Sequence, residues 1–324
     1  MAQTEVIQTQ LSTERYLEQW LGHVRGRVRA STYEGYEALL RLHAMPHLHT
    51  VPLDSLRPLH LQNLYARLLA QTEPRRLSAG TVLNLHLVLT HALGQAVRWQ
   101  LLPSNPAAGA QPPRPRRPEL GVFEQSTLSR ILVAVRGTRL ELPAAMAVAT
   151  GMRRGEILGL RWTDVDSDLG VARVRRTLQP TADGLTYEEP KTPRSRRAVV
   201  LPRFLKPHLK RHRSDQDRRR ALAGVAWRDL GLVVDRGNGG AINPDSFSTS
   251  WARFLARAGL PHVRFHDLRH AHATLMLAKG VHPKIVSERL GHSSIGITLD
   301  TYSHVLPSMQ SEAAQAFDEL FETP

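Results

Sequence analysis

Two stretches near the end of the chain hold polar residues of the types that cut a phosphodiester. RFHDLRHAHATLML contains His266 and Arg269, three residues apart in a run whose apolar residues predict a buried helix. LGHSSIGITLDTYSH follows and contains His292 and Tyr302. His266 and Arg269 can project from one helix face and hold a phosphate there, and Tyr302 is the candidate nucleophile.

Direct displacement at a phosphodiester makes three demands on a site without a metal. The nucleophile must be positioned, charge on the non-bridging oxygens must be neutralised, and the departing 5′-oxygen must be protonated. Arginine suits the second task because its planar fork donates two hydrogen bonds to one phosphate. A free tyrosine has a pKa of about 10, so Tyr302 needs cations and a base nearby. We expect His292 to donate to a non-bridging oxygen, and His266 to bond the phosphate or accept the Tyr302 proton.

HDLRH, LGHSS and DTYSH together resemble the tyrosine recombinase (phage integrase) family. The resemblance runs from about residue 12 to the C-terminus. Enzymes of this family break and rejoin DNA through a 3′-phosphotyrosine and need no metal and no nucleotide. The resemblance therefore implies a site-specific DNA recombinase that uses no cofactor, an integrase of a phage or other mobile element.

The same resemblance adds two cations and a carboxylate to the site. ATGMRRGEILGLRW matches the block around the family's first catalytic arginine, with Arg153 at the arginine position; the adjacent Arg154 would face elsewhere on a helix. Glu156 stands at the carboxylate position and would hold an arginine or histidine in place. Lys191 lies where the family's hairpin carries the lysine that protonates the leaving 5′-oxygen. The implied catalytic residues are Arg153, Lys191, His266, Arg269, His292 and Tyr302.

Two other classes of protein compete with this interpretation. His266 and His270, four apart with Asp267 between them, approximate a zinc-hydrolase pattern. The zinc-hydrolase pattern has Glu at the position that Asp267 occupies here, and a zinc mechanism would leave Tyr302 without a role. A DNA-binding regulator derived from the same family would do no chemistry. Loss of a catalytic residue would be its sign, and the sequence retains all six.

The composition favours a polyanionic partner such as double-stranded DNA. The chain has 43 basic and 29 acidic residues and a formal net charge of +14. A GC-rich genome could also produce this excess without selection for DNA binding, because 38 of the basic residues are Arg. The chain has no cysteine, which excludes disulfides, thiolate catalysis and Cys-rich zinc modules. No apolar run approaches the roughly 20 residues of a membrane helix, and the N-terminus lacks the features of a signal peptide. We expect a cytoplasmic protein that does not contact a membrane.

Helical periodicity and a proline-rich stretch divide the chain into two expected domains. Residues 1–101 predict a four-helix bundle, and the resemblance identifies it with the SAM-like core-binding domain that clamps one face of the duplex. LPSNPAAGAQPPRPRRPE at 102–119 predicts an extended linker. Within it, Arg114, Arg116 and Arg117 could contact DNA backbone phosphates.

Residues 120–324 predict a mostly helical α+β catalytic domain. Strand patterns at 171–178, 184–189 and 196–202 predict a small antiparallel sheet. The tail at 308–324 predicts an amphipathic helix. Four protomers of the family exchange such helices on two duplexes, which implies a tetramer on DNA. Only about ten residues precede the first expected helix, so we expect short target sites; an accessory directionality factor could supply contacts to more distant ones.

Overall fold

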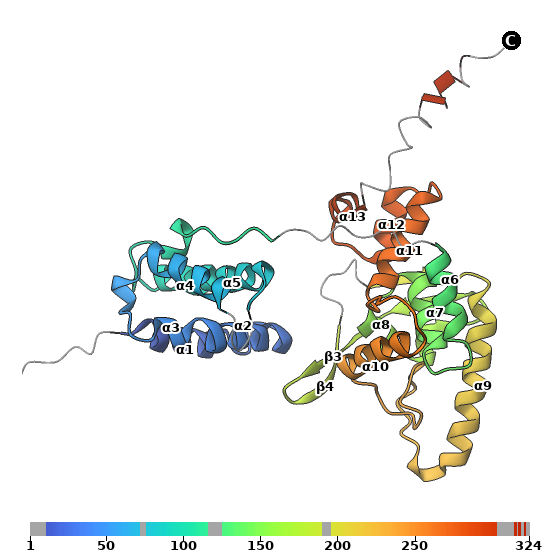
Figure 1. Cartoon of the computed structure of the whole chain (residues 1–324). Helices are drawn as coiled ribbons and strands as arrows, with labels where there is room; N and C mark the ends of the chain where they lie inside the picture. The colour runs from blue at the N-terminus through green and yellow to red at the C-terminus, as the bar shows by residue number, and fades with distance from the viewer. Residues whose placement is uncertain are drawn as a thin grey trace, which may run out of the picture. The chain divides into compact units, whose positions relative to one another are not determined.

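The computed structural model of the chain divides into two compact units, residues 1–120 and 121–324, each described below by itself (Figure 1). Both units are mostly helical, and the second carries small antiparallel sheets, as predicted. No helix in the described part of the chain is both long and apolar enough to cross a membrane. The described residues are 11–71, 76–115, 125–189 and 196–302, with Ala314, Gln315, Phe317, Asp318 and Phe321.

In its described residues, the first unit is a bundle of four longer helices with short helical turns between them. Its core is built around the fully buried Trp20, which stacks on Tyr36 with ring centroids 5.6 Å apart. Ser12 and Ser78 begin two of the helices by accepting hydrogen bonds from backbone N–H groups of the first turn. The elements are α1 (Thr13–Val24), α2 (Ala30–His43), α3 (Met45–Leu48), η1 (Leu53–Ser55), α4 (Pro58–Ala70), α5 (Ala79–Arg98) and η2 (Pro106–Gly109).

The proline-rich stretch begins inside this first unit. Leu102, Ala107 and Ala110 are buried in its core, so the first part of the stretch that the sequence assigned to the linker packs against the helices. Arg114 follows in exposed, irregular chain, whereas Arg116 and Arg117 lie outside the described residues. The domain limits 1–101, 102–119 and 120–324 stay predictions.

The second unit packs its helices around α7, whose apolar residues are nearly all buried. Figure 1 shows α7 in green beside α11 in orange, and the two helices are in contact. The helices are α6 (Gln125–Ala134), α7 (Glu141–Thr150), α8 (Arg154–Leu158), η3 (Trp162–Asp164), α9 (Leu205–Ala223), η5 (Gly224–Ala226), α10 (Pro244–Arg257), α11 (Asp267–Ala278), α12 (Pro283–Leu290) and α13 (Ile295–Tyr302).

In the described residues of the second unit, five short strands form two antiparallel sheets, whereas the sequence predicted one. The larger has the order β1-β2-β5, and β3 and β4 form a separate hairpin. The run at 171–178, predicted as a single strand, holds the whole of one strand and the start of another. Arg176 turns the chain between them and donates a 2.6 Å hydrogen bond to the buried Asp164. The strands are β1 (Val165–Asp166), β2 (Val171–Val174), β3 (Thr177–Thr181), β4 (Gly184–Glu188) and β5 (Arg197–Val200).

Candidate active site

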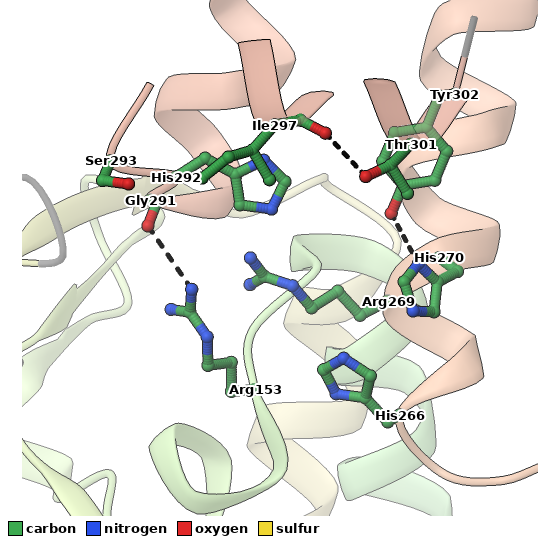
Figure 2. A pocket seen from close by; sticks show the side chains of 10 residues that line it. All are labelled: Arg153, His266, Arg269, His270, Gly291, His292, Ser293, Ile297, Thr301 and Tyr302. Carbon is green, nitrogen blue, oxygen red and sulfur yellow. Dashed lines mark hydrogen bonds between the residues drawn. The ribbon is translucent and has the colours of Figure 1, made fainter. Parts of the chain in front are cut away.

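A pocket of about 360 Å³ in the second unit brings five of the six expected catalytic residues together (Figure 2). Helix ends position them, because Arg153 precedes α8 and His266 precedes α11 as N-cap residues. The pocket is lined by Arg153, His266, Arg269, His292 and Tyr302, together with His270, Gly291, Ser293, Ile297 and Thr301. Lys191 lies outside the described residues, and its role stays a prediction.

Glu156 lies beneath the pocket and fixes Arg153. Its side chain is 2% exposed and accepts hydrogen bonds from the Arg153 backbone N–H at 2.8 Å and from Nη1 at 2.9 Å. The Arg153 Nη2 reaches the Gly291 carbonyl oxygen at 3.4 Å (Figure 2). The Arg153 side chain is still 38% exposed, so its guanidinium can meet a ligand in the pocket. The neighbouring Arg154 turns away to Ser248 and Asp245.

A second arginine, Arg197 on β5, completes the surroundings of Glu156. Its Nη1 and Nη2 donate to the two carboxylate oxygens at 3.0 and 2.9 Å, and its Nε donates to the Arg289 carbonyl at 2.6 Å. Burial alone would raise the pKa of Glu156, but hydrogen bonds and charge from Arg197, with the charge of Arg153, outweigh burial and hold the pKa below its usual value. Sequence reasoning missed Arg197. The available signal was strand alternation, which puts Arg197 on the same face as the buried Val199.

Arg269 is buried and held by backbone carbonyls at two helix ends. Its Nη1 donates to the Gly151 oxygen at 2.6 Å, and its Nη2 donates to the Leu290 oxygen at 2.8 Å. Gly151 ends α7 in the left-handed conformation with φ of 65°, and Gly291 ends α12 in the same way. Burial, followed by the charge of Arg153, lowers the pKa of Arg269 to about 9, so the guanidinium remains charged at neutral pH.

Both expected catalytic histidines are neutral at neutral pH. Burial, followed by the charges of Arg269 and Arg153, lowers the pKa of His292 to about 4. His292 is oriented by a 2.8 Å hydrogen bond between its Nδ1 and the hydroxyl of the buried Thr298. His266 is exposed on one side, but partial desolvation in the pocket, followed by charge on His270 and Arg269, lowers its pKa to about 4. A neutral imidazole keeps one ring nitrogen as a donor and the other as an acceptor.

Tyr302 ends α13 with its hydroxyl directed at His270 (Figure 2). The Oη atom lies 2.7 Å from His270 Nδ1, and the tyrosine is only 1% exposed. Burial raises the pKa of Tyr302 to about 12, although the charge of Arg269 opposes this rise. Burial also lowers the pKa of His270 below its usual value. Sequence reasoning considered His270 only as a zinc ligand, although its position four residues after His266 places it on the same helix face.

The zinc-hydrolase alternative lacks converging ligands. The Asp267 carboxylate accepts hydrogen bonds from the Arg264 side chain at 2.8 Å and from the Arg264 backbone N–H at 2.9 Å. His270 turns its Nδ1 to Tyr302 instead. Within the described ranges, no group of three His, Asp or Glu side chains is placed to hold a metal ion.

Over most of its length, the sequence of this chain is similar to the sequences of known tyrosine recombinases and integrases. The model described as the phage integrase family matches residues 122–309, and the one described as a phage integrase N-terminal SAM-like domain matches residues 14–69. A tyrosine recombinase XerC-like protein of Caldanaerobacter subterraneus subsp. tengcongensis is 31% identical over 322 residues, covering 93% of this chain and 81% of the relative. An integrase of Saccharopolyspora erythraea is 26% identical, covering 96% and 82%.

Solved structures share the fold. The Tn1549 transposon integrase in complex with transposon right end DNA matches with a TM-score of 0.77 and 20% identity, covering 93% of this chain and 98% of that one. A lambda integrase dimer bound to a COC′ core site matches with a TM-score of 0.66 and 16% identity, covering 90% and 95%. With the SAM-like match, these similarities confirm the predicted fold class of a helical bundle followed by an α+β domain.

Proposed function

The chain belongs to the phage integrase family, as the resemblance in its sequence predicted, and we propose that it breaks and rejoins double-stranded DNA at specific sites through a 3′-phosphotyrosine at Tyr302. The observation that carries the proposal is one pocket holding the Tyr302 hydroxyl together with Arg153, Arg269 and His292. These groups answer two of the three demands of phosphodiester displacement, a positioned nucleophile and donors for the phosphate oxygens.

In the proposed reaction the Tyr302 Oη attacks the scissile phosphorus. Arg153 and Arg269 stabilise the negative charge that gathers on the non-bridging oxygens, and His292 donates a hydrogen bond to one of them. Lys191 gives its proton to the departing 5′-oxygen. A 5′-hydroxyl from another strand then attacks the phosphotyrosine and rejoins the DNA without metal or ATP.

The relatives support a role in a mobile element. They include integrases, among them the ICEBs1 integrase of Bacillus subtilis, and the Tn1549 integrase was solved with transposon DNA. We propose that this chain is an integrase of a phage or similar element, that four protomers assemble on paired sites in the cytoplasm, and that an accessory directionality factor biases the outcome. A regulator that does no chemistry is less well supported, because Arg153, His266, Arg269, His292 and Tyr302 are all present and line one pocket.

The proposal is tested by trapping the covalent intermediate. Nicked target DNA incubated with the protein in EDTA should yield an adduct that survives denaturant, because no step uses a metal. Tyr302→Phe should abolish the adduct. Tyr187→Phe is the matched control, since Tyr187 lies on β4, outside the pocket, and its buried hydroxyl makes no hydrogen bond to any residue that the structure describes.

Adduct formation by Tyr302→Phe would show that another nucleophile acts. Cleavage that depends strictly on magnesium would exclude the proposed mechanism.

A further inference from the structure

His270 contacts the reacting oxygen, and the reaction proposed above gives it no part. Its Nδ1 lies 2.7 Å from the Tyr302 Oη, within the range of a strong hydrogen bond (Figure 2). We propose that His270 is the base that takes the Tyr302 proton when the phosphotyrosine forms. The inference rests on the proposed function, because this proton moves only if Tyr302 attacks DNA.

The geometry favours His270 over His266 for this task. Both project from the start of α11, and their ring centroids are 5.1 Å apart. In the described part of the chain, however, a hydrogen bond joins the Tyr302 hydroxyl to His270 Nδ1 and none joins Tyr302 to His266. A base must lie within hydrogen-bond reach of the proton that it removes. His266 is thereby left to bond the phosphate, the other role expected for it.

The charges around His270 suit a proton acceptor. The groups that face it are Asp267, Arg269 and Arg264, with His266 and Tyr302 in ring contact on either side. Burial lowers the pKa of His270, Asp267 partly opposes burial, and the two arginines lower the pKa further, so the ring is neutral before the reaction. Asp267 can then stabilise the imidazolium that forms, while Arg269 stabilises developing charge on the Tyr302 oxygen.

The step balances in both directions. When Oη attacks phosphorus, the Oη–P bond forms, the P–O5′ bond breaks, and the Oη proton moves to His270 Nδ1, while the general acid protonates O5′. During rejoining the 5′-hydroxyl attacks phosphorus and loses its proton to that same acid, now a base. The Oη–P bond breaks, and Tyr302 recovers its proton from His270.

The test measures single-turnover adduct formation on nicked target DNA, in EDTA and across pH 5 to 8, with the full chain. His270→Ala removes the base, and His270→Asn keeps a hydrogen-bond acceptor that cannot take the proton. Both should slow adduct formation by about 10²–10⁴-fold, the usual contribution of a positioned base. Imidazole added to the buffer should restore part of the His270→Ala rate, more at higher pH where imidazole is neutral. His262→Ala, at an exposed histidine in the loop before α11, should form adduct at the wild-type rate.

Half-site binding and thermal unfolding of each variant allow rates to be compared between folded, bound proteins. An active His270→Asn enzyme would limit His270 to holding the tyrosine and would overturn the proposal. Rescue by imidazole in His266→Ala but not in His270→Ala would also overturn it, because the base would then be His266. If wild-type protein forms no adduct, the proposed function itself fails, and that result does not depend on His270.

Discussion

At the residue scale, the proposed catalytic cations Arg269 and Lys191 differ in whether they can give up a proton. Arg269 keeps its charge at neutral pH and is tied to two carbonyls, so it can stabilise charge but cannot serve as an acid there. Lys191 is one of five lysines in a chain that otherwise uses arginine, and an amine can release its proton. The proposed division of work follows from this difference.

DNA with sulfur in place of the bridging 5′-oxygen separates the two roles, because a thiolate leaves without being protonated. Lys191→Ala should lose about 10²–10⁴-fold in single-turnover cleavage of ordinary DNA and recover most of that loss on the sulfur substrate. Arg269→Ala should stay slow on both substrates, because the charge that it stabilises remains. Lys284→Ala is the control, since Lys284 pairs with the exposed Glu288 outside the pocket. Equal recovery of both active-site variants would contradict the assignment.

Sequence motifs located five pocket residues and the orienting carboxylate of Glu156, but not the other side chains that contact them. HDLRH, LGHSS and DTYSH supplied four positions by resemblance, and their spacing along the chain left open which side chains touch. Arg197 belongs to no spacing that had been interpreted as chemistry, and His270 had been considered only as a zinc ligand. Each is recognised by a long-range contact, with Glu156 and Tyr302 respectively. Such contacts depend on packing between distant elements, which periodicity does not report.

At the element scale, the Glu156 carboxylate joins three segments. It lies on α8, Arg197 reaches it from β5, and the same arginine donates to the Arg289 carbonyl in α12. The segment that carries Arg153 is therefore fixed to the sheet and to the helix that precedes His292. Removing one partner of such a buried pair leaves an uncompensated charge.

Arg197→Ala should reduce the free energy of unfolding of the second unit by about 3–5 kcal/mol, because Glu156 would remain buried and charged. Arg196→Ala should change it by less than about 0.5 kcal/mol, since Arg196 is 59% exposed and pairs with the exposed Glu189. Urea unfolding of the full chain measures both. Adding Glu156→Gln to Arg197→Ala should recover part of the loss. Equal stability of Arg196→Ala and Arg197→Ala would show that this ion pair does not hold the segments together.

The elements were hardest to predict where local composition and tertiary packing disagree. Proline and alanine at 102–110 are typical of a linker, yet the small apolar residues there fill the core of the first unit. The run at 171–178 is typical of one strand, yet the chain leaves the strand pattern at Arg176, which donates a hydrogen bond to the buried Asp164, and β2 and β3 belong to separate sheets. The helices were easier to predict, because an apolar stripe at helical spacing reports burial directly.

At the scale of the whole molecule, the tail at 308–324 carries two exposed phenylalanines among its described residues. Most of it lies outside the described residues, but Phe317 and Phe321 are 64% and 77% exposed, and their ring centroids are 5.7 Å apart. An apolar pair of this kind is stabilised by contact with another surface. We propose that this surface belongs to a neighbouring protomer on DNA, in a head-to-tail contact that closes into a ring.

Removing residues 308–324 should leave binding to a single half-site nearly intact but abolish assembly on paired sites and strand exchange. Phe317→Ala combined with Phe321→Ala should act in the same direction, whereas Gln315→Ala with Asp318→Ala, on the same tail, should have little effect. Gel shifts on one and two half-sites and a recombination assay measure these outcomes. Normal recombination by the truncated protein would contradict docking on a neighbour, and loss of half-site binding would place the tail in the core of its own unit.

Under the proposed function, the two arginine contacts with Gly151 and Gly291 also bear on when a newly synthesised chain could first cleave DNA. Arg269 reaches back 118 residues to Gly151, and Arg153 reaches forward 138 residues to Gly291. Contacts between such distant residues cannot form until the ribosome has synthesised both, and closing long loops is slow. Under the proposed function, the first unit is synthesised before the catalytic pocket can be completed, so a nascent or prematurely terminated chain would lack the assembled cleavage site. The order of synthesis would then separate folding of the first unit from DNA cleavage.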